Sequence, residues 1–200
     1  MQNNNCIAII PARGGSKRIK RKNIKNFFGY PIISYAIKNA ISSKLFKDVI
    51  ISTDDNEIAN KALKYGAKVP FIRPKKISGD DVGILEVMSH SVSALLSNYH
   101  NLSAVCCIFP ATPLLNKSDL TKSFKIFKTR KWEYVFGAIK FNHPPLRGFA
   151  LNKRKGLDMF SKNSVNKNEK TQNFKTIYHD AGQFYWANPK TWIKKKKVFS

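Results

Sequence analysis

IAIIPARGGSKRIKRKN, residues 7–23, joins a short apolar strand to a loop of glycine and basic residues. The predicted strand ends at Pro11, and the loop after it carries six cations: Arg13, Lys17, Arg18, Lys20, Arg21 and Lys22. The adjacent Gly14 and Gly15 let backbone amides come close to a ligand, and amides beside cations suit several phosphate charges. The spacing matches neither the P-loop nor the dinucleotide-binding GxGxxG pattern. The stretch therefore predicts a nucleoside triphosphate site, with a solvated basic patch as the alternative.

Length and composition are those of a single globular domain. The chain has 200 residues, 42% of them hydrophobic, which is enough for a core. No apolar stretch reaches the length that spans a bilayer, and the first residues, MQNNN, lack the basic start of a signal peptide. Cys6, Cys106 and Cys107 fit neither a disulfide framework nor a metal-binding spacing. We therefore expect a cytoplasmic protein with no membrane partner.

The net charge of +24, from 36 basic and 12 acidic residues, is extreme for an enzyme that acts on small molecules. Such a charge is typical of proteins that bind nucleic acid. However, the lysines are spread along the whole chain, and no helix-turn-helix, zinc-finger or RNP pattern accompanies them. We expect no nucleic-acid partner, and a basic nucleic-acid-binding protein stays open as the distant alternative.

Strand and helix patterns alternate along the chain. Apolar runs predict strands over residues 6–10, 48–52, 68–72, 104–109 and 134–139. Helical periodicity predicts helices over residues 31–43, 57–65 and 83–96, and a fourth helix that begins at a Ser118 cap. This order predicts an α/β fold of three layers, in which helices cover both faces of a mostly parallel sheet.

Four polar loops directly follow predicted strands, and they begin at Ala12, Thr53, Arg73 and Pro110. Parallel sheets bind ligands beyond the carboxyl ends of their strands, so we expect these loops to form one site. Asp54 and Asp55 lie in the second loop, and we interpret both as helix-capping residues rather than metal ligands.

Residues 140–178 interrupt the alternation. The segment contains two adjacent prolines, two glycines and the polar run SKNSVNKNEKTQN, residues 161–173, and it is too long for an ordinary connection. By pattern alone it is an unstructured insertion. A turn and an alternating aromatic strand, YHDAGQFYW over residues 178–186, follow it, and Tyr185 and Trp186 are predicted core residues.

The loop after the first strand resembles the N-terminal signature of the acylneuraminate cytidylyltransferases, which activate sialic acid and related nine-carbon acid sugars as CMP conjugates. The resemblance is carried by Pro11, Ala12, Arg13, Gly14, Gly15, Ser16, Lys17, Lys22 and Asn23. The string YHDAGQFYW is similar to the pseudaminic acid branch of that family. The resemblance implies a Rossmann-like nucleotidyltransferase fold, with one domain over residues 1–200. It also implies a homodimer in which residues 140–178 form a dimerisation arm.

The implied reaction is attack by the anomeric hydroxyl of an acid sugar on the α-phosphorus of CTP, with loss of pyrophosphate and with Mg²⁺ as cofactor. The CMP-sugar would serve surface glycan or flagellin glycosylation. Pseudaminic acid is the expected sugar, and N-acetylneuraminate, legionaminate and Kdo are the alternatives.

The resemblance also implies roles for individual residues. Arg13 and Lys22 are the expected catalytic residues. The expected nucleotide-binding residues are Ala12, Arg13, Gly14, Gly15, Ser16, Lys17, Asn23, Arg73 and Ser78. The candidates for binding the sugar substrate are Pro110, Thr112, Tyr178, His179, Asp180 and Gln183.

The C-terminus departs from the family pattern. Members usually end in an Asp-Ile-Asp-Thr-like motif, whose aspartates bind the metal, and a final helix. This sequence stops at KKKKVFS, residues 194–200, before that motif. We therefore assign no metal ligand from the sequence, and a truncated, inactive homologue is a further alternative.

Overall fold

The computed structural model describes residues 5–129, 132–159 and 170–199. Two compact units make up the chain: the first contains Met1–Gly137 and Gly182–Ser200, and the second contains Ala138–Ala181. The first unit holds the core and its helices, and the second holds a small two-stranded hairpin.

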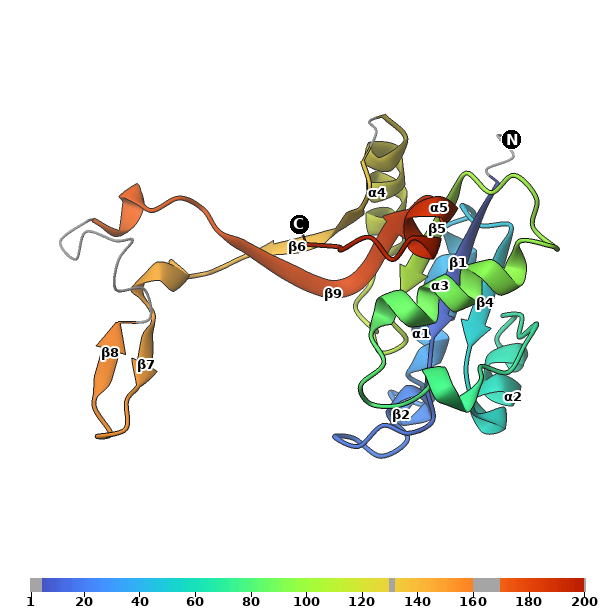
Figure 1. Cartoon of the computed structure of the whole chain (residues 1–200), viewed down its shortest axis with the longest axis horizontal. Coiled ribbons are helices and arrows are strands. Elements are labelled where there is room, and N and C mark those ends of the chain that lie inside the picture. The colour runs from blue at the N-terminus through green and yellow to red at the C-terminus, as the bar shows by residue number, and fades with distance from the viewer. Residues whose placement is uncertain (1–4, 130–131, 160–169, 200) are drawn as a thin grey trace. The chain divides into compact units, whose positions relative to one another are not determined.

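The central sheet has five strands (Figure 1): β1 (Cys6–Pro11), β4 (Asp48–Ser52), β5 (Ala104–Ile108), β6 (Val135–Lys140) and β9 (Tyr178–Ala187). Their order in the sheet is β4-β1-β5-β9-β6. Strand β1 pairs in parallel with β4 and β5, whereas β9 pairs antiparallel to β5. The predicted α/β fold is confirmed, with a sheet that is parallel at β4, β1 and β5 and antiparallel at β9.

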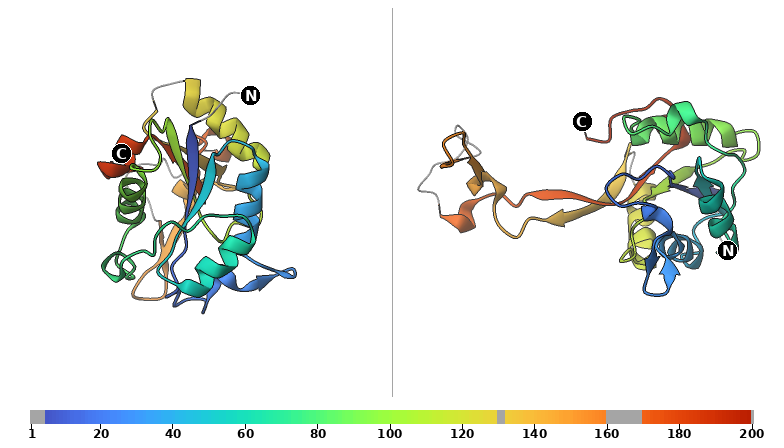
Figure 2. Two further views of the ribbon diagram at one scale, coloured as in Figure 1. Left: turned by 90° about the vertical axis from the view of Figure 1, so that its right-hand side faces the viewer. Right: turned by 90° about the horizontal axis from the view of Figure 1, so that it is seen from below.

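Helices lie on both faces of the sheet (Figure 2): α1 (Ile33–Ser42), α2 (Asn56–Lys64), α3 (Ile84–Leu95), α4 (Lys117–Thr129) and α5 (Pro189–Ile193). The apolar residues of α1, α2 and α4 form one core cluster with the sheet, and those of α3 and α5 form another on the opposite face. A short hairpin of β2 (Asn26–Phe27) and β3 (Tyr30–Pro31) leads into α1. The three predicted layers are therefore present.

Strand β1 shows why an uninterrupted apolar run belongs at the centre of such a sheet. Ala8 and Ile10 lie in the core cluster with α1, whereas Ile7 and Ile9 lie in the cluster with α3. All four side chains are fully buried. Successive side chains of a strand point to opposite faces, so a strand covered on both faces needs apolar residues at every position.

Residues 68–72 do not form the predicted strand. Two isolated bridges take the place of a ladder: Lys68 pairs with Ile50 of β4, and Ile72 pairs with Thr53 just after that strand. Pro70 lies between these bridges, and proline has no N–H to donate to a ladder. The segment still runs beside β4. It places Arg73 at the carboxyl end of that strand, where the Arg73 N–H donates to the Thr53 carbonyl.

The predicted cap of α4 is wrong by two residues. The helix begins at Lys117, and the Asn116 side-chain oxygen accepts a hydrogen bond from the Ser118 N–H at 3.0 Å. Asn and Ser both accept hydrogen bonds from backbone N–H groups at helix starts. The sequence pattern therefore does not show whether Asn116 or Ser118 caps the helix.

Strand β9 confirms the predicted core role of its aromatic residues. Trp186 is fully buried, and its Nε1–H donates to the Ser123 hydroxyl of α4 at 2.9 Å. Tyr185 is 5% exposed and lies in the cluster on the other face. The three cysteines are buried and free, in agreement with the absence of a disulfide pattern.

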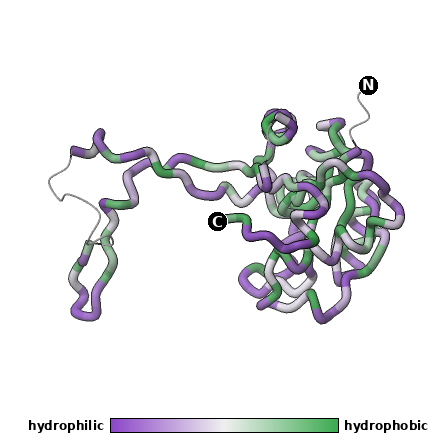
Figure 3. Tube along the Cα trace, turned by 45° about the horizontal axis from the view of Figure 1, so that its top comes forward, coloured by the Kyte–Doolittle hydropathy of each residue, from purple (hydrophilic) through white to green (hydrophobic). Residues whose placement is uncertain are grey.

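The second unit contains a hairpin of β7 (Phe149–Leu151) and β8 (Leu157–Met159) and two short 3-10 helices, η3 (Pro145–Arg147) and η4 (Thr171–Asn173). The turn between the two strands is hydrophilic (Figure 3). The segment 140–178 falls within this unit, and residues 161–169 of its polar run lie outside the described residues. None of the helices in the described ranges is long and apolar enough to cross a membrane.

Candidate nucleotide site

Loops from separate parts of the chain meet beyond the carboxyl ends of β1, β4 and β5. They enclose a cavity of about 250 Å³, whose lining includes Arg13, Lys22, Asn23, Arg73, Ser78 and Pro110. A second cavity of about 220 Å³ shares Arg13, Lys22 and Asn23 with the first and adds Ser16, Lys17 and Arg18. The sequence predicted that these loops gather at one sheet edge, and the structure brings them together there.

Lys22 lines both cavities and directly follows a sharp turn of the backbone. Arg21 has a left-handed conformation (φ 54°), and the 3-10 helix η1 (Lys22–Ile24) begins immediately after it. The Arg21 guanidinium donates to the carboxylates of Asp55 and Glu57. These contacts hold the turn, and the hydrogen bond from Arg21 lowers the pKa of Asp55. Arg21 therefore stabilises the turn that precedes Lys22. From the sequence alone, Arg21 was one of the six cations of the predicted phosphate-binding loop.

Asp80 pairs with two of the predicted phosphate-binding cations. Arg13 Nη2 lies 2.8 Å from one Asp80 carboxylate oxygen, and Lys17 Nζ lies 2.5 Å from the other. Arg13 Nη1 also donates to the Gly79 carbonyl at 2.9 Å. The hydrogen bond from Lys17 lowers the pKa of Asp80. An ionised carboxylate thus sits among the cations in the free protein.

Asn23 lies at both cavities and is 4% exposed. Its Nδ2 donates to the Arg13 carbonyl at 2.9 Å, which fixes the orientation of the amide. Its Oδ1 is buried and accepts no hydrogen bond within the part of the chain that the structure describes. An unsatisfied buried acceptor costs about 1–3 kcal/mol, so this oxygen is a position at which a bound ligand can donate.

Arg73 is only 3% exposed although it carries a charge. Its backbone N–H donates to the Thr53 carbonyl at 2.7 Å, and its Nε donates to the Ser78 hydroxyl at 3.1 Å. Nη2 lies 3.7 Å from Asp54 Oδ1. Burial lowers the pKa of Arg73, and the Asp54 carboxylate opposes that effect. The guanidinium stays charged because its ordinary pKa is so high, and Ser78 orients it.

The two glycines of the loop have different surroundings. The Gly14 N–H donates to Asp54 Oδ1 at 2.9 Å, and a Cβ on Gly14 would lie 2.5 Å from Asp55 Oδ2. A Cβ on Gly15 would meet nothing within 4 Å. Close approach of the loop to the turn after β4 therefore requires glycine at position 14, whereas position 15 leaves open space.

Asp54 and Asp55, both predicted as helix caps, have separate roles. Asp55 caps α2 as predicted, because its side chain accepts from the Ile58 N–H at 2.9 Å. The prediction is wrong for Asp54, whose carboxylate contacts Gly14 and Arg73 instead. A capping pattern identifies an acidic pair before a helix, but it does not show which member faces the neighbouring loop.

One side of the larger of the two cavities is apolar, and the sequence did not assign it to the site. It is made by Val82, Ile84, Val87 and Phe109. Ile84 and Val87 belong to the first turn of α3, where their spacing reads as an ordinary core stripe. A flat, uncharged base is the part of a nucleotide that such a surface suits.

Several predicted residues lie outside these cavities. Ala12 is buried and donates its N–H to the Ser52 carbonyl at 2.9 Å. The Thr112 hydroxyl donates to the Phe109 carbonyl at 2.7 Å, so it closes a turn. Neither residue lines the two cavities at the sheet edge. The Gln183 carbonyl accepts from the Phe109 N–H at 2.9 Å, which places β9 beside the loop after β5.

Three sugar-side candidates belong to the second unit. Tyr178 is 60% exposed, and the His179 ring packs edge-on against Phe141 with ring centroids 4.8 Å apart. His179 Nδ1 lies 2.9 Å from the Asp180 carbonyl oxygen. These contacts place His179 in a local cluster within its own unit.

The described residues contain no cluster of three or more His, Cys, Asp or Glu side chains that could hold a metal. Asp80 is the carboxylate that lines both cavities, and it is ion-paired with Arg13 and Lys17. Mg²⁺ requires oxygen ligands in near-octahedral geometry. The carboxylates of this site, as they are paired here, do not fit a dedicated Mg²⁺ site.

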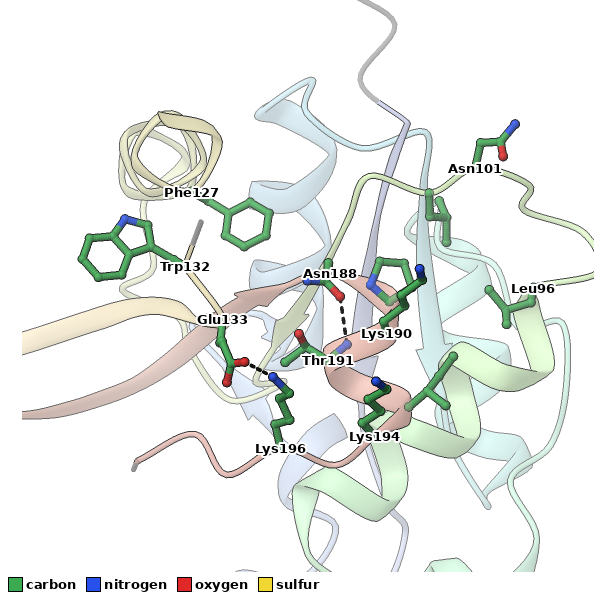
Figure 4. A pocket seen from close by; sticks show the side chains of 13 residues that line it. Leu96, Asn101, Phe127, Trp132, Glu133, Asn188, Lys190, Thr191, Lys194 and Lys196 are labelled. Carbon is green, nitrogen blue, oxygen red and sulfur yellow. Dashed lines mark hydrogen bonds and ion pairs between the residues drawn. The ribbon is translucent and has the colours of Figure 1, made fainter. Parts of the chain in front are cut away.

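A larger cavity, of about 790 Å³, lies at the amino end of β5 and beside α5 (Figure 4). Apolar side chains such as Leu96 and Phe127 line it, together with three lysines. Lys196 pairs with Glu133, and Asn188 caps α5 by accepting from the Thr191 N–H at 2.8 Å. This cavity lacks a glycine-containing loop, and parallel strands present ligands at their carboxyl ends. The smaller cavities therefore remain the candidate for the predicted nucleotide site.

Comparisons with known proteins show the family of the chain. The cytidylyltransferase family model matches residues 7–197. Pseudaminic acid cytidylyltransferase of Campylobacter jejuni is 41% identical over 193 residues, which are 96% of this chain and 82% of the relative. N-acylneuraminate cytidylyltransferase of Escherichia coli is 27% identical over 194 residues, which are 96% of this chain and 44% of the relative.

Solved structures share the fold. The structure of CMP:2-keto-3-deoxy-manno-octonic acid synthetase complexed with CTP matches with a TM-score of 0.68 at 16% identity, and the match covers 94% of this chain and 75% of that chain. At this identity the likeness shows the fold alone, which is the Rossmann-like nucleotidyltransferase architecture.

Proposed function

Because the chain belongs to the cytidylyltransferase family, whose members are nucleotidyltransferases, we propose that it transfers the cytidylyl group of CTP to pseudaminic acid. The observation that carries the proposal is the convergence of Arg13, Lys22 and buried Arg73 at one cavity beyond the carboxyl ends of β1 and β5. The 41% identity to a pseudaminic acid cytidylyltransferase, against 27% to an N-acylneuraminate enzyme, favours pseudaminic acid as the sugar.

In the proposed reaction, the anomeric hydroxyl oxygen of the sugar bonds to the α-phosphorus of CTP. The bond between that phosphorus and the bridging oxygen of the β-phosphate breaks, pyrophosphate leaves and the hydroxyl proton is released. Negative charge builds on the phosphate oxygens, so cations and amides held in place beforehand lower the barrier. No covalent nucleophile of the protein is required.

The triphosphate is proposed to bind Arg13, Ser16 and Lys17 and the amide of Gly15, while Gly14 shapes the loop because its N–H already donates to Asp54. Lys22 is proposed to contact the α-phosphate, which is attacked in the reaction, because it lines both cavities. The ion pairs of Arg21 stabilise the turn directly before it and so limit the movement of its backbone. The exchange of Asp80 for a phosphate would free Arg13 and Lys17 from their present partner.

The base is proposed to lie against the apolar side of the cavity, with Arg73 donating to the acceptors on the edge of cytosine. Arg73 suits this role because its guanidinium is buried and oriented by Ser78, and a planar fork of donors matches two adjacent acceptors. The buried Asn23 Oδ1 has no partner within the described ranges, so it is proposed to accept a hydrogen bond from the nucleotide.

The sugar is proposed to bind on the side of Pro110 and Gln183, which lie at the loop after β5 and at the strand beside it. Tyr178, His179 and Asp180 remain proposed sugar contacts because they open the string YHDAGQFYW, which is similar to the pseudaminic acid branch. Thr112 is proposed to shape this loop through its hydrogen bond to Phe109.

Magnesium is proposed as the cofactor on the family resemblance. When bound, it would neutralise phosphate charge and polarise the phosphoryl oxygens. The carboxylates described at this site are already paired with cations, so we derive no step through the metal. Location in the cytoplasm is proposed on the same resemblance.

The second unit is proposed to be a dimerisation arm. Phe149, Leu151 and Leu157 of its hairpin are 62%, 72% and 67% exposed. Phe149 pairs with Met159, and Leu151 pairs with Leu157. Because side chains alternate along strands and paired residues share a face, all four lie on one face of the hairpin. A two-stranded hairpin is marginally stable alone, and a second copy of the chain would cover that face.

The reaction is tested by measuring pyrophosphate release from CTP and Mg²⁺ with pseudaminic acid, N-acetylneuraminate, legionaminate and Kdo offered separately. Rapid release with pseudaminic acid, and slow release with the other sugars, is the expected result. Faster release with another sugar would replace the substrate but keep the reaction. Absence of release with all four sugars would overturn the proposed activity.

A further inference from the structure

One carboxylate oxygen joins two parts of the candidate site. Asp54 Oδ1 accepts a hydrogen bond from the Gly14 N–H at 2.9 Å and lies 3.7 Å from Arg73 Nη2. We infer that Asp54 is a positioning residue that fixes the phosphate loop and Arg73 relative to each other and thereby sets the preference for cytosine over uracil. This inference rests on the proposed function, because it takes Arg73 as the residue that contacts the base.

Arg73 depends on its neighbours because it is buried. Only 3% of the residue is exposed, and a buried charge is tolerated when it is paired and hydrogen-bonded. Ser78 fixes the Nε end of the guanidinium at 3.1 Å, and Asp54 is the carboxylate opposite the Nη2 end. Arg13 repels the Arg73 charge, so removal of the Asp54 charge would leave that repulsion uncompensated.

The two adjacent carboxylates make different contacts. Asp55 accepts from the Ile58 N–H and from Arg21, and its Oδ2 lies beside Gly14, 2.5 Å from where a Cβ on that glycine would be. Asp54 accepts from the Gly14 N–H and faces Arg73. Asp55 supplies the cap of α2, so the helix start does not depend on Asp54.

The orientation of Arg73 matters for the choice of base. Cytosine presents two adjacent acceptors, O2 and N3, whereas uracil carries an N–H at N3. A guanidinium in a fixed plane can donate to both cytosine acceptors and meets a donor on uracil. Sites that hydrogen-bond one ligand specifically reject the mismatched ligand strongly. Loss of the fixed orientation should therefore weaken discrimination more than it weakens phosphate binding.

Two variants separate the two contacts of Asp54. Asp54→Asn keeps an acceptor oxygen for the Gly14 N–H but removes the charge opposite Arg73, and Asp54→Ala removes both. We expect Asp54→Asn to reduce the ratio of CTP to UTP affinity about tenfold, while inorganic pyrophosphate, which has no base, binds as in the unaltered protein. Asp54→Ala should weaken pyrophosphate binding as well. Titration calorimetry with CTP, UTP and pyrophosphate measures all three affinities.

Asp48→Asn is the matched control, because it removes the same charge at the amino end of β4, the strand that leads to the turn holding Asp54. Asp48 pairs with Lys68 at 2.6 Å and accepts from the Tyr99 hydroxyl at 2.8 Å, so its loss should leave the CTP to UTP ratio unchanged. Thermal unfolding shows that each variant is folded. An unaltered protein that binds CTP no more tightly than UTP would overturn the proposed function and this inference together. An unchanged ratio in Asp54→Asn, with CTP preferred by the unaltered protein, would overturn this inference alone.

Discussion

The Asp80 carboxylate lies 2.8 Å from the Arg13 guanidinium and thereby fills, in the free protein, a position that suits a phosphate. Lys17 contacts the other oxygen of the same carboxylate. An anionic ligand that takes the position of this carboxylate would displace Asp80 from Arg13 and Lys17. The binding site and the carboxylate that competes for it are thus parts of one surface.

Asp80→Asn should tighten CTP binding by about two- to fivefold, because the variant keeps the shape of the side chain but no longer competes for Arg13 and Lys17. Titration calorimetry of CTP measures the effect. Asp81→Asn is the control, because Asp81 is exposed and lines neither cavity. Weaker CTP binding by Asp80→Asn would show that Asp80 supports the complex.

Lys22→Ala should lower kcat for pyrophosphate release by about 10²–10³-fold, the usual loss when one group that stabilises transition-state charge is removed. The Lys22 ammonium makes no ion pair among the described residues, so the unfolding temperature should not change. Lys20→Ala, an exposed site outside both cavities, is the control. An unaltered kcat in Lys22→Ala would remove Lys22 from the mechanism.

Gly14→Ala should destabilise the protein by about 1–3 kcal/mol, the usual cost of overpacking. The new Cβ would lie 2.5 Å from Asp55 Oδ2 and 2.9 Å from Asp55 Cβ, and Asp55 is held by Arg21 and by its cap on α2. The unfolding temperature should fall by about 2–4 °C for each kcal/mol. Gly15→Ala, where nothing lies within 4 Å of the new atom, should leave that temperature unchanged. Equal shifts in both variants would contradict the loop geometry.

Asp55→Asn should weaken the dependence of the free energy of unfolding on pH in the acid range. The hydrogen bond from Arg21 lowers the pKa of Asp55 in the folded protein. Its stabilising effect is therefore present above the unfolded-state pKa, which is about 3.9, and is lost as the pH falls through the lower folded-state value. Asn still caps the helix, so the variant should lose about 1–2 kcal/mol at pH 7 and progressively less below pH 4.

Urea unfolding at several pH values measures this difference. Glu57→Gln, at the more exposed partner of Arg21, should have a smaller effect at pH 7. A destabilisation by Asp55→Asn that is the same at pH 3 and pH 7 would rule out the ion pair as its cause.

Leu151→Lys should convert a dimer into a monomer, because it places a charge on the exposed apolar face of the β7–β8 hairpin. Ala150→Lys adds the same charge to the opposite face of that hairpin and should leave the dimer intact. Sedimentation velocity at micromolar concentration compares the two. A monomeric unaltered protein, or the same behaviour in both variants, would contradict the proposed arm.

Much of this site could be predicted from the order of strands and loops. An apolar run as short as residues 6–10, ended by Pro11, is typical of a strand covered on both faces. The loops that follow such a strand and its parallel neighbours lie at one edge of the sheet. That rule places Arg13, Arg73 and Pro110 together without any side-chain information. The predicted strand over residues 68–72 does not form, because Pro70 interrupts it. The segment still runs beside β4 and places Arg73 at the same edge of the sheet.

The contacts made by individual carboxylates could not be predicted in this way. Asp54 and Asp55 are adjacent acidic residues before the same helix, so the sequence does not show which of them caps it. The structure distinguishes them, because Asp55 accepts from the Ile58 N–H whereas Asp54 accepts from the Gly14 N–H. Asp80 lies in a loop without periodicity, so its pairing with Arg13 depends on a contact between residues 67 positions apart. The sequence predicted Arg21 as one of several phosphate-binding cations. In the structure Arg21 has a left-handed conformation and its guanidinium donates to Asp55.

The most direct test of where CTP binds is hydrogen exchange of the full chain with and without CTP. Binding at the candidate site predicts slower exchange within residues 12–24, 73–87 and 109–113, with no change around the larger cavity at residues 96–102 and 188–196. Protection confined to residues 96–102 and 188–196 would place the nucleotide in the cavity at the other end of β5 and contradict the proposed site.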